Sequence, residues 1–246
     1  MNLVYTQHQG AQYLKQQDCM WTGDHVIQLS DQSVVLREVN EELLIGLADG
    51  VSASPCAELA SKLVMSELNL AVQKHDFSNK AVRYLHERLS AKFSRTRCVG
   101  ASTTLLVVSA SRNQLRIMSV GDSRAYLVDK GNNLELLTKD HSFINQMIEE
   151  GKADEQVDYG TCYNVLTDCL VADPEEFDFN IFARTIAFKL TDRLFICTDG
   201  VYDTLGKKLS ELFDYNLSIE AQAVLVRKAV LENNPVDNFS FMILER

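Results

Sequence analysis

The sequence has 246 residues, of which 46% are hydrophobic and 24% are charged, and its formal net charge is -10 at pH 7. Such a composition is typical of a globular protein that is long enough to bury a large core. The negative charge argues against a general nucleic-acid binder, and no apolar run approaches the roughly 18 residues needed to cross a membrane. We therefore expect neither a nucleic-acid nor a membrane partner.

The remaining composition indicates one compact unit. With three prolines and no long linker, low-complexity segment or repeat, the chain is expected to form a single domain over residues 1–246. Its six cysteines include no C-x-x-C pair, and several lie in apolar runs, as reduced core thiols do. The first residues lack the pattern of a signal peptide, so the expected location is the cytoplasm.

The first hundred residues change from strand to helix patterns. Residues 1–39 are rich in strand-forming residues, with strands predicted over 26–29 and 34–36 around a turn at 30–33. The apolar run 43–49 predicts a buried strand that ends at Asp49. Two helices are then expected, the first from about Pro55 to Val72 and the second with one apolar face: Val82, Leu85, Leu89 and Phe93.

After Gly100 the pattern returns to strands. Three short strands, expected to form a meander, are predicted over 103–108, 115–120 and 124–128. The polar stretch 140–176 predicts helix and loop. The last predicted elements are two strands, one helix with a single apolar face, and a final strand: 181–190, 193–198, the helix of Ile219, Ala223, Val226 and Val230, and 239–244.

This order of elements differs from the regular β-α alternation of a parallel sheet. It favours an α+β fold in which helices pack outside two antiparallel sheets.

Acidic residues recur where apolar strands end. Asp49-Gly50 and Asp199-Gly200 each follow an apolar run, Asp122 lies in the turn after 115–120, and Asp237 precedes the last strand. Each one alone is compatible with simple turn chemistry. Four carboxylates at strand ends also suit Mg²⁺ or Mn²⁺, which prefer oxygen ligands. The pattern therefore suggests a carboxylate metal centre without naming a reaction.

The same motifs carry a family resemblance. The chain resembles the compact bacterial form of the metal-dependent type 2C (PPM) serine/threonine protein phosphatases. The resemblance covers almost the whole chain and rests on six motifs in the family's order: Leu47-Ala48-Asp49-Gly50-Val51 with Glu58 and Ala60-Ser61, Gly100-Ala101-Ser102-Thr103-Thr104, Val120-Gly121-Asp122-Ser123-Arg124-Ala125-Tyr126, Leu137-Thr138-Lys139-Asp140-His141-Ser142, Cys197-Thr198-Asp199-Gly200-Val201-Tyr202-Asp203 and Val236-Asp237-Asn238-Phe239-Ser240. It implies a four-layer α-β-β-α sandwich, with two antiparallel sheets flanked by helices.

The resemblance also implies a ligand set for two ions of Mn²⁺ or Mg²⁺. Asp49 would bridge the two ions, and the backbone carbonyl of Gly50 would add an oxygen. Asp199 and Asp237 would hold one ion, and Asp18 would support the other through water. The positions that match the ligands of a third, weaker ion are Asp122, Asp203 and Asp199.

The implied reaction is hydrolysis of phosphoserine or phosphothreonine on proteins. A hydroxide bound by the two ions would attack phosphorus in line, with Asp49 and Asp199 acting in water activation. The expected partner is a phosphorylated protein, a target of a partner serine/threonine kinase, and the expected state is a monomer.

Some residues depart from the family pattern. Gln17 stands before Asp18 where the family has glutamate, which removes one charge near the second ion, and Ser52-Ala53 replaces a glycine pair. Tyr13 occupies the place of an arginine that grips substrate phosphate, so Tyr13, Lys15 and Arg37 are the candidates for that role.

The sequence also bears on two other functions. Gln17 and Tyr13 would suit a catalytically weak or inactive relative that binds a phosphoprotein or a kinase, whereas the intact Asp49, Asp199 and Asp237 favour an enzyme. A phosphatase of the aspartyl-phosphate type would need an Asp-x-Asp motif, which these aspartates lack. His141 is predicted to be a structural hydrogen-bonding residue at a helix start.

Overall fold

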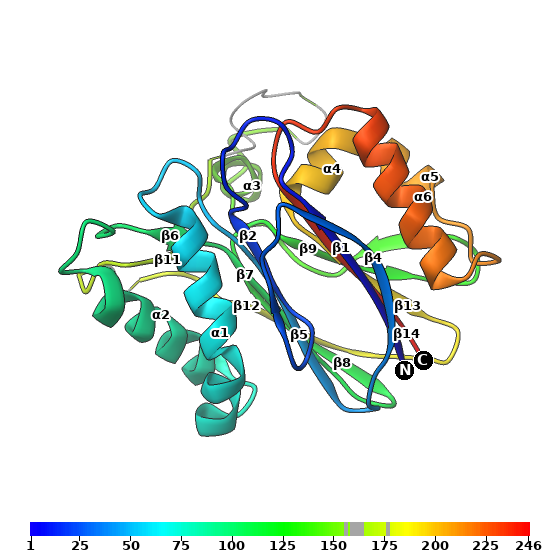
Figure 1. Cartoon of the computed structure of the whole chain (residues 1–246), viewed down its shortest axis with the longest axis horizontal. Helices are drawn as coiled ribbons and strands as arrows, with labels where there is room; N and C mark the ends of the chain where they lie inside the picture. The colour runs from blue at the N-terminus through cyan, green and yellow to red at the C-terminus, as the bar shows by residue number, and fades with distance from the viewer. Residues whose placement is uncertain (155–156, 158–164, 176–177) are drawn as a thin grey trace.

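The computed structural model describes residues 1–154, 157, 165–175 and 178–246. Two antiparallel sheets lie face to face, and helices cover both outer faces (Figure 1). In the described residues the first sheet has six strands in the order β10 (Leu134–Leu136), β9 (Arg124–Val128), β13 (Arg193–Cys197), β14 (Phe239–Glu245), β1 (Asn2–His8) and β4 (Asp31–Glu38). The second has, likewise in order, β12 (Phe182–Ala187), β8 (Gln114–Val120), β7 (Leu105–Ala110), β5 (Leu43–Asp49), β2 (Asp18–Trp21) and β3 (Val26–Ile27).

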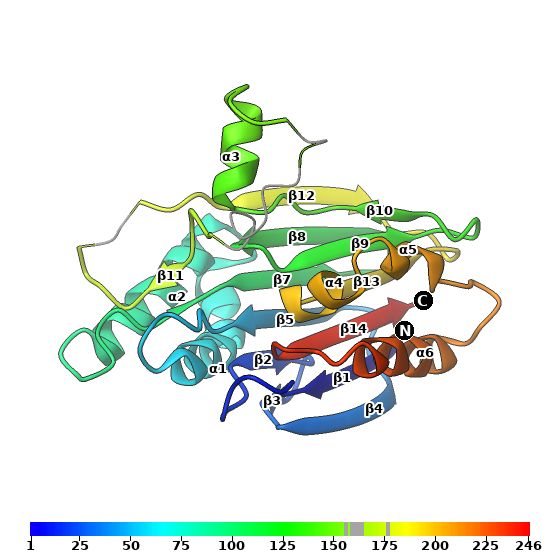
Figure 2. The same cartoon turned by 90° about the horizontal axis from the view of Figure 1, so that it is seen from above.

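The helices complete the layers. The second sheet is covered by α1 (Ala57–His75) and α2 (Asn79–Phe93), and the first by α4 (Asp199–Leu205), α5 (Lys208–Glu211) and α6 (Ile219–Glu232). A short helix, α3 (Phe143–Glu149), projects from one end of the sandwich (Figure 2). A two-stranded ladder joins β6 (Ser102–Thr103) to β11 (Leu170–Val171). The expected α-β-β-α sandwich is confirmed.

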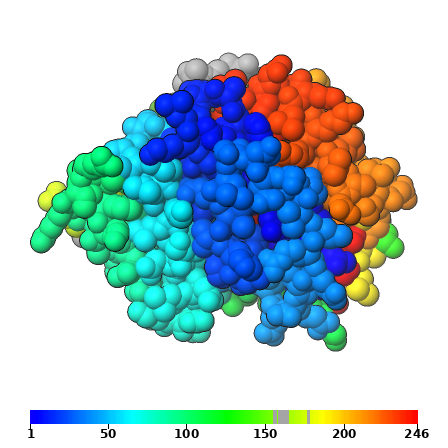
Figure 3. Space-filling model, viewed as in Figure 1, coloured from blue at the N-terminus to red at the C-terminus, as the bar shows by residue number. Residues whose placement is uncertain are grey.

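The buried apolar residues of the described part of the chain form three cores, and strand alternation assigns side chains to them. In β14, Met242 and Leu244 point between the sheets, while Phe241 and Ile243 point toward α4 and α6. This is the two-residue period of a strand with both faces buried. β14 lies between β1 and β13 at the centre of its sheet, so the two ends of the described chain meet there, with Asn2 opposite Glu245. The ends marked N and C lie side by side in Figure 1, and in the space-filling view red and dark blue atoms lie together on the same side of the molecule (Figure 3).

The predicted meander is wrong. β7 and β8 form a hairpin, but β9 leaves for the other sheet and pairs with β13 and β10. The crossing begins at Gly121, whose φ of +102° is a backbone conformation that favours glycine. A Cβ there would lie 2.6 Å from the Thr104 side chain, so the turn also needs a residue without one.

The predicted turn at 30–33 is also wrong beyond Ser30. β4 already begins at Asp31, because Asp31 and Gln32 pair with His8 and Gln7 of β1. Polar residues on an edge strand resemble a turn in sequence, since one side of the strand faces water. The helix predicted from Pro55 begins two residues later, at Ala57.

The cysteines divide into two groups. Cys56 and Cys98 form a disulfide, which corrects the expectation of reduced thiols at these two positions. The sequence did not predict this disulfide, because the two cysteines are separated by 42 positions and only the folded chain brings them together. Among the other described cysteines, Cys19 and Cys197 are free and buried, and Cys169 is partly buried. Cys162, and the part of the predicted helix-and-loop stretch at 155–156, 158–164 and 176–177, lie outside the described residues.

No helix in the described part of the chain is long and apolar enough to cross a membrane.

Candidate metal centre

Five of the predicted ligand residues line one cavity at an end of the sandwich. The cavity has a volume of about 160 Å³, and its walls include Asp49, Gly50, Asp122, Asp199 and Asp237. The rest of its lining is Tyr13, Val51, Ser52, Thr104 and Leu166. Distant parts of the chain therefore meet at the strand ends, as the sequence pattern suggested.

Asp49 is held by the strand beside it and by the loop after it. Asp49 and Asp18 are direct register partners on β5 and β2. The Asp49 N–H donates to the Thr104 hydroxyl at 3.0 Å, and the Asp49 carbonyl accepts from the Thr103 hydroxyl at 2.9 Å. Gly50 follows with its N–H bonded to the Gln17 carbonyl at 3.1 Å. These bonds fix the backbone on both sides of the carboxylate.

Position 50 has room only for glycine. A Cβ at this position would lie 2.4 Å from the carbonyl oxygen of Ala57, in the first turn of α1. This close approach brings the backbone of the Asp49 loop against the helix, so any larger residue would displace the loop.

Asp199 begins α4, with Thr198 as the N-cap residue. The sequence suggested a turn here; the helix was missed because it is short. A Cβ on Gly200 would lie 2.0 Å from the Asn238 carbonyl, so this glycine allows α4 to touch the segment before β14. That contact brings Asp199 and Asp237 to the same cavity.

Asp18 lies behind the cavity and is fully buried. Its Oδ2 accepts hydrogen bonds from the hydroxyls of Ser240 at 2.7 Å and Thr198 at 2.9 Å. Its Oδ1 has no hydrogen-bond partner, and the same holds for the buried Oδ1 of Asp199. Two carboxylate oxygens in the described site are thus buried without a donor, which is costly unless a cation is bound.

The carboxylates perturb one another. Burial raises the pKa of Asp18 to about 7, opposed by the Ser240 hydrogen bond and reinforced by the charge of Asp237. Burial also raises the pKa of Asp49 well above its ordinary value, and the charges of Asp18, Asp199 and Asp237 raise it further. Burial followed by the charges of Asp122 and Asp237 raises the pKa of Asp199 in the same way.

The pKa values of Asp122, Asp203 and Asp237 are raised as well. Burial, followed by the charge of Asp140, raises the pKa of Asp122 to about 7, with a further contribution from Asp203. Burial is also the main cause that raises the pKa of Asp203 and the pKa of Asp237. Crowded, buried carboxylates of this kind are unfavourable as a set of free anions.

These residues fit a group of divalent cations by their chemistry. The donors are oxygens, two of them lack partners, and mutual repulsion among the carboxylates would be relieved by positive charge. Within the described residues, however, no three His, Cys, Asp or Glu side chains are already arranged as a complete metal cluster.

Two residues outside the predicted ligand set, Tyr202 and Arg124, support the site. The Tyr202 hydroxyl donates to the Asp122 carbonyl at 3.1 Å, and the Arg124 guanidinium stacks on the Tyr202 ring at 3.6 Å. Arg124 also forms a bidentate ion pair with Asp140, with its shortest contact at 2.6 Å. The family motifs contain all of these residues, but their spacing does not reveal the contacts.

The three candidates for a phosphate grip are placed differently. Tyr13 lines the cavity. Lys15 is mostly exposed and forms an ion pair with Glu58 on α1. Arg37 is not at this end of the sheets: it pairs with Leu3, at the far end of β1 from His8, and it binds Asp24 through two contacts of 2.7 and 2.5 Å. Arg37 is therefore excluded as a phosphate ligand in this cavity.

His141 has the structural role that its sequence position predicted. The imidazole Nδ1 of His141 accepts from the backbone N–H of Gly121 at 3.0 Å, and the backbone N–H of His141 donates to the Gly121 carbonyl at 2.9 Å. The two bonds fix the turn that carries Asp122.

Comparisons with known proteins agree with the fold and the motifs. A family model described as "Protein phosphatase 2C" matches residues 28–232. The chain is 24% identical over 230 residues to the serine/threonine phosphatase stp of Listeria welshimeri serovar 6b, covering 88% of this chain and 89% of that protein. It is 28% identical over 171 residues to the serine/threonine protein phosphatase PstP of Mycobacterium tuberculosis, covering 66% of this chain and 32% of that protein.

Solved structures share the architecture. The serine/threonine phosphatase Stp1 from Staphylococcus aureus superposes with a TM-score of 0.81 at 20% identity, covering 99% of this chain and 94% of that one. The catalytic domain of PstP, in a complex with two manganese ions, superposes with a TM-score of 0.74 at 20% identity, covering 99% of this chain and 98% of that one. With the family model matching most of its length, the chain belongs to the protein phosphatase 2C family.

Proposed function

We propose that this protein is a metal-dependent phosphatase that hydrolyses phosphoserine and phosphothreonine on proteins. The observation that carries the proposal is the gathering of Asp49, Asp122, Asp199 and Asp237 around one cavity, with the buried Asp199 Oδ1 left without a donor. The named relatives, which are serine/threonine phosphatases, support the same substrate class.

The proposed ligand set is that of the family motifs. Asp49 and the Gly50 carbonyl would contribute oxygens to two ions of Mn²⁺ or Mg²⁺. Asp199 and Asp237 would hold one ion, and Asp18 would support the other. Asp122 and Asp203, with Asp199, would hold a third ion. The structure of the PstP catalytic domain in complex with two manganese ions supports a divalent metal such as Mn²⁺ at this site.

Divalent ions bound at such a site supply an activated water and neutralise charge on the phosphoryl oxygens. The chain's own contribution is to hold its carboxylates rigidly: strand pairing fixes Asp18 against Asp49, and close glycine contacts fix Asp49 and Asp199. None of the described residues that line the cavity is a lysine or arginine. A phosphate dianion would thus be repelled by the bare carboxylates, so its binding depends on the cations.

The physiological setting follows from the same proposal. The substrate is a phosphoprotein that a partner serine/threonine kinase has modified, and the enzyme acts in the cytoplasm as a monomer. Its catalytic domain spans residues 1–246.

A phosphothreonine peptide tests this function. Hydrolysis is measured by phosphate release with Mn²⁺, with EDTA, and for the variants Asp49→Asn and Asp199→Asn. We expect activity that needs the metal and falls at least about 100-fold in both variants, since each removes a charge that holds the cations.

The matched control is Asp129→Asn, at a half-buried turn residue outside the site. This variant should retain full activity. Metal-loaded protein that binds the phosphopeptide but releases no phosphate would contradict the proposal.

A further inference from the structure

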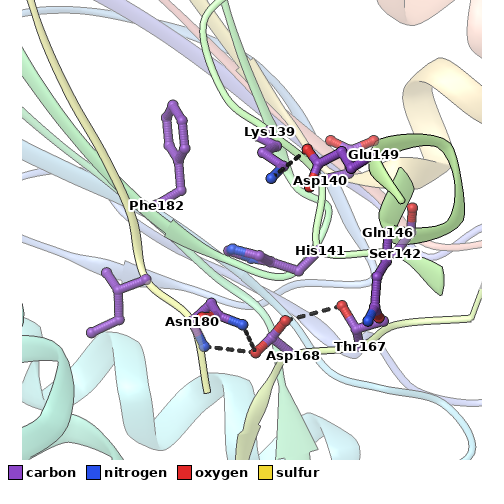
Figure 4. A pocket seen from close by; sticks show the side chains of 11 residues that line it. Lys139, Asp140, His141, Ser142, Gln146, Glu149, Thr167, Asp168, Asn180 and Phe182 are labelled. Carbon is purple, nitrogen blue, oxygen red and sulfur yellow. Dashed lines mark hydrogen bonds and ion pairs between the residues drawn. The ribbon is translucent and has the colours of Figure 1, made fainter. Parts of the chain in front are cut away.

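A second cavity lies beside the metal centre, under α3. We call it the α3 cavity; it has a volume of about 450 Å³, and its walls include Lys139, His141, Glu149, Asp168 and Phe182 (Figure 4). It is at the same end of the sandwich as the metal centre, since Phe182 pairs with Ser119, three residues before Asp122.

The two cavities share their dividing wall. Leu166 lines the metal centre, and Asp168, two residues later, lines the α3 cavity. On the other side of the wall, Gly121 is bonded to His141 while its neighbour Asp122 faces the metal centre. A chain bound in one cavity can thus reach the other within a few residues, because an extended chain advances about 3.3 Å per residue.

Asp168 is a buried carboxylate without a cation. Only 8% of the residue is exposed, and its oxygens accept from the Asn180 N–H at 2.6 Å, the Asn180 side-chain amide at 3.1 Å and the Thr167 hydroxyl at 3.0 Å. All three donors are neutral. The charged neighbours are already paired, Lys139 with Glu149 and Arg124 with Asp140, so no described cation balances Asp168.

His141 presents an unused donor to the same cavity. It is also only 8% exposed, and its Nδ1 accepts the Gly121 N–H, which leaves the proton of the neutral ring on Nε2. No described residue accepts a hydrogen bond from Nε2. The imidazole points into the cavity between Phe182 and Asn180 (Figure 4).

Together these groups define the chemistry of a ligand. It must offer a cation to Asp168 and a hydrogen-bond acceptor to His141, and an aliphatic stem would pack on Phe182. A lysine or arginine residue within a peptide has all three parts: the charged head, the backbone carbonyl and the stem. A metal ion is a poorer fit, because the Nε2 of His141 carries a proton.

We propose that the α3 cavity is a specificity subsite that binds a lysine or arginine of the substrate, a few residues from the phosphorylated one. The inference rests on the proposed function and names its substrate class: phosphoproteins with a basic residue beside the phosphosite. A basic flank also offsets the repulsion between a phosphopeptide and a protein of net charge -10.

A peptide series tests the subsite. A neutral phosphothreonine peptide is compared with versions that carry one lysine, placed in turn at each of about five positions on either side. At the matching positions we expect lysine to raise kcat/KM about tenfold, mainly through a lower KM. In Asp168→Asn, which keeps the side-chain shape, this preference should vanish while turnover of the neutral peptide is unchanged. Glu87→Gln, an exposed change on α2, should keep the preference.

Several results would overturn the subsite. The first is a lysine series with no preferred position, and the second is a lysine preference that remains in Asp168→Asn. The third is inhibition by free lysine as strong as inhibition by the peptide, which would indicate a small-molecule site. Binding of the same peptides, measured by fluorescence anisotropy, gives a readout that does not need hydrolysis. If no peptide is hydrolysed but lysine still strengthens binding through Asp168, the proposed function fails and the subsite stands.

Discussion

The Tyr202 hydroxyl donates a hydrogen bond of 3.1 Å to the backbone carbonyl of Asp122, which ties α4 to the turn between β8 and β9. Tyr202 is itself part of α4, between Asp199 and Asp203. One bond therefore sets the spacing between carboxylates that come from two separate elements.

The variant Tyr202→Phe removes this bond and keeps the ring on which Arg124 stacks. A hydrogen bond contributes about 1 kcal/mol, so Mn²⁺ affinity should weaken roughly fivefold. Isothermal titration calorimetry measures it directly. Tyr84→Phe, on α2 and outside the cavity, serves as the control and should leave the affinity unchanged. Equal affinities in both variants would show that Tyr202 does not position the ligands.

The ion pair of Arg124 and Asp140 is predicted to support the stability of the whole sandwich end. Arg124→Ala leaves the buried Asp140 carboxylate without its cation, which costs about 3–5 kcal/mol in comparable buried pairs. Urea unfolding followed by circular dichroism should show this loss. Arg112→Ala, which breaks an exposed pair with Glu41, should leave the midpoint unchanged. A midpoint for Arg124→Ala equal to that of the native protein would refute the prediction.

The stability of the metal-free protein should fall as the pH rises from about 4 to above 7. Burial raises the pKa of Asp18 and of Asp122 to about 7 in the folded protein, from an ordinary value of 3.8. Within this window the folded state holds protons that the unfolded chain has lost, so their stabilising effect disappears as the pH rises through 7.

Thermal unfolding in EDTA at a series of pH values measures this effect. Asp18→Asn cannot titrate at this position, so it should flatten the dependence. Binding of Mn²⁺ should strengthen over the same window, by about tenfold per pH unit where one proton is displaced. A stability in EDTA that rises between pH 5 and pH 8 would contradict the assigned direction of the pKa shifts.

Gln17→Glu should tighten metal binding. The backbone of Gln17 is fixed beside the site, since its N–H donates to the Asn238 side chain at 2.6 Å and its carbonyl accepts from Gly50. A glutamate there adds one negative charge next to Asp18, which should increase Mn²⁺ affinity about threefold to tenfold. Calorimetric titration tests it, with Gln114→Glu as the control, an exposed change at the end of β8 far from Asp122. Unchanged or weaker affinity would place the Gln17 side chain away from the metals.

The sequence located many of the strands and helices, and it singled out four aspartates that the structure brings to one cavity. Apolar runs ending in aspartate located β5 and β13, and the recurring motifs identified Asp49, Asp122, Asp199 and Asp237 before their positions in space were known. Strand ends are predictable in this way because the change from apolar to acidic residues is abrupt.

Features that depend on packing were not predictable. The crossing of β9 to the other sheet depends on the backbone of Gly121 and its contact with Thr104. The sequence position of Arg37 does not reveal that it forms an ion pair with Asp24 at the far end of the sheet. The sequence also did not single out Asp168, because it lies in a stretch with many acidic residues. Only its burial and its neutral hydrogen-bond partners distinguish it.

The central position of β14 has a consequence for how the protein is made. The strand comprises residues 239–245, yet it separates β1 from β13 and carries the Ser240 hydroxyl that holds Asp18. A nascent chain on the ribosome therefore lacks the middle of its first sheet until these residues leave the exit tunnel. Because pairing of β1 with β14 is the most distant contact along the chain, it closes late. The hydrogen bond from Ser240 to Asp18 therefore forms only once β14 has entered the sheet between β1 and β13.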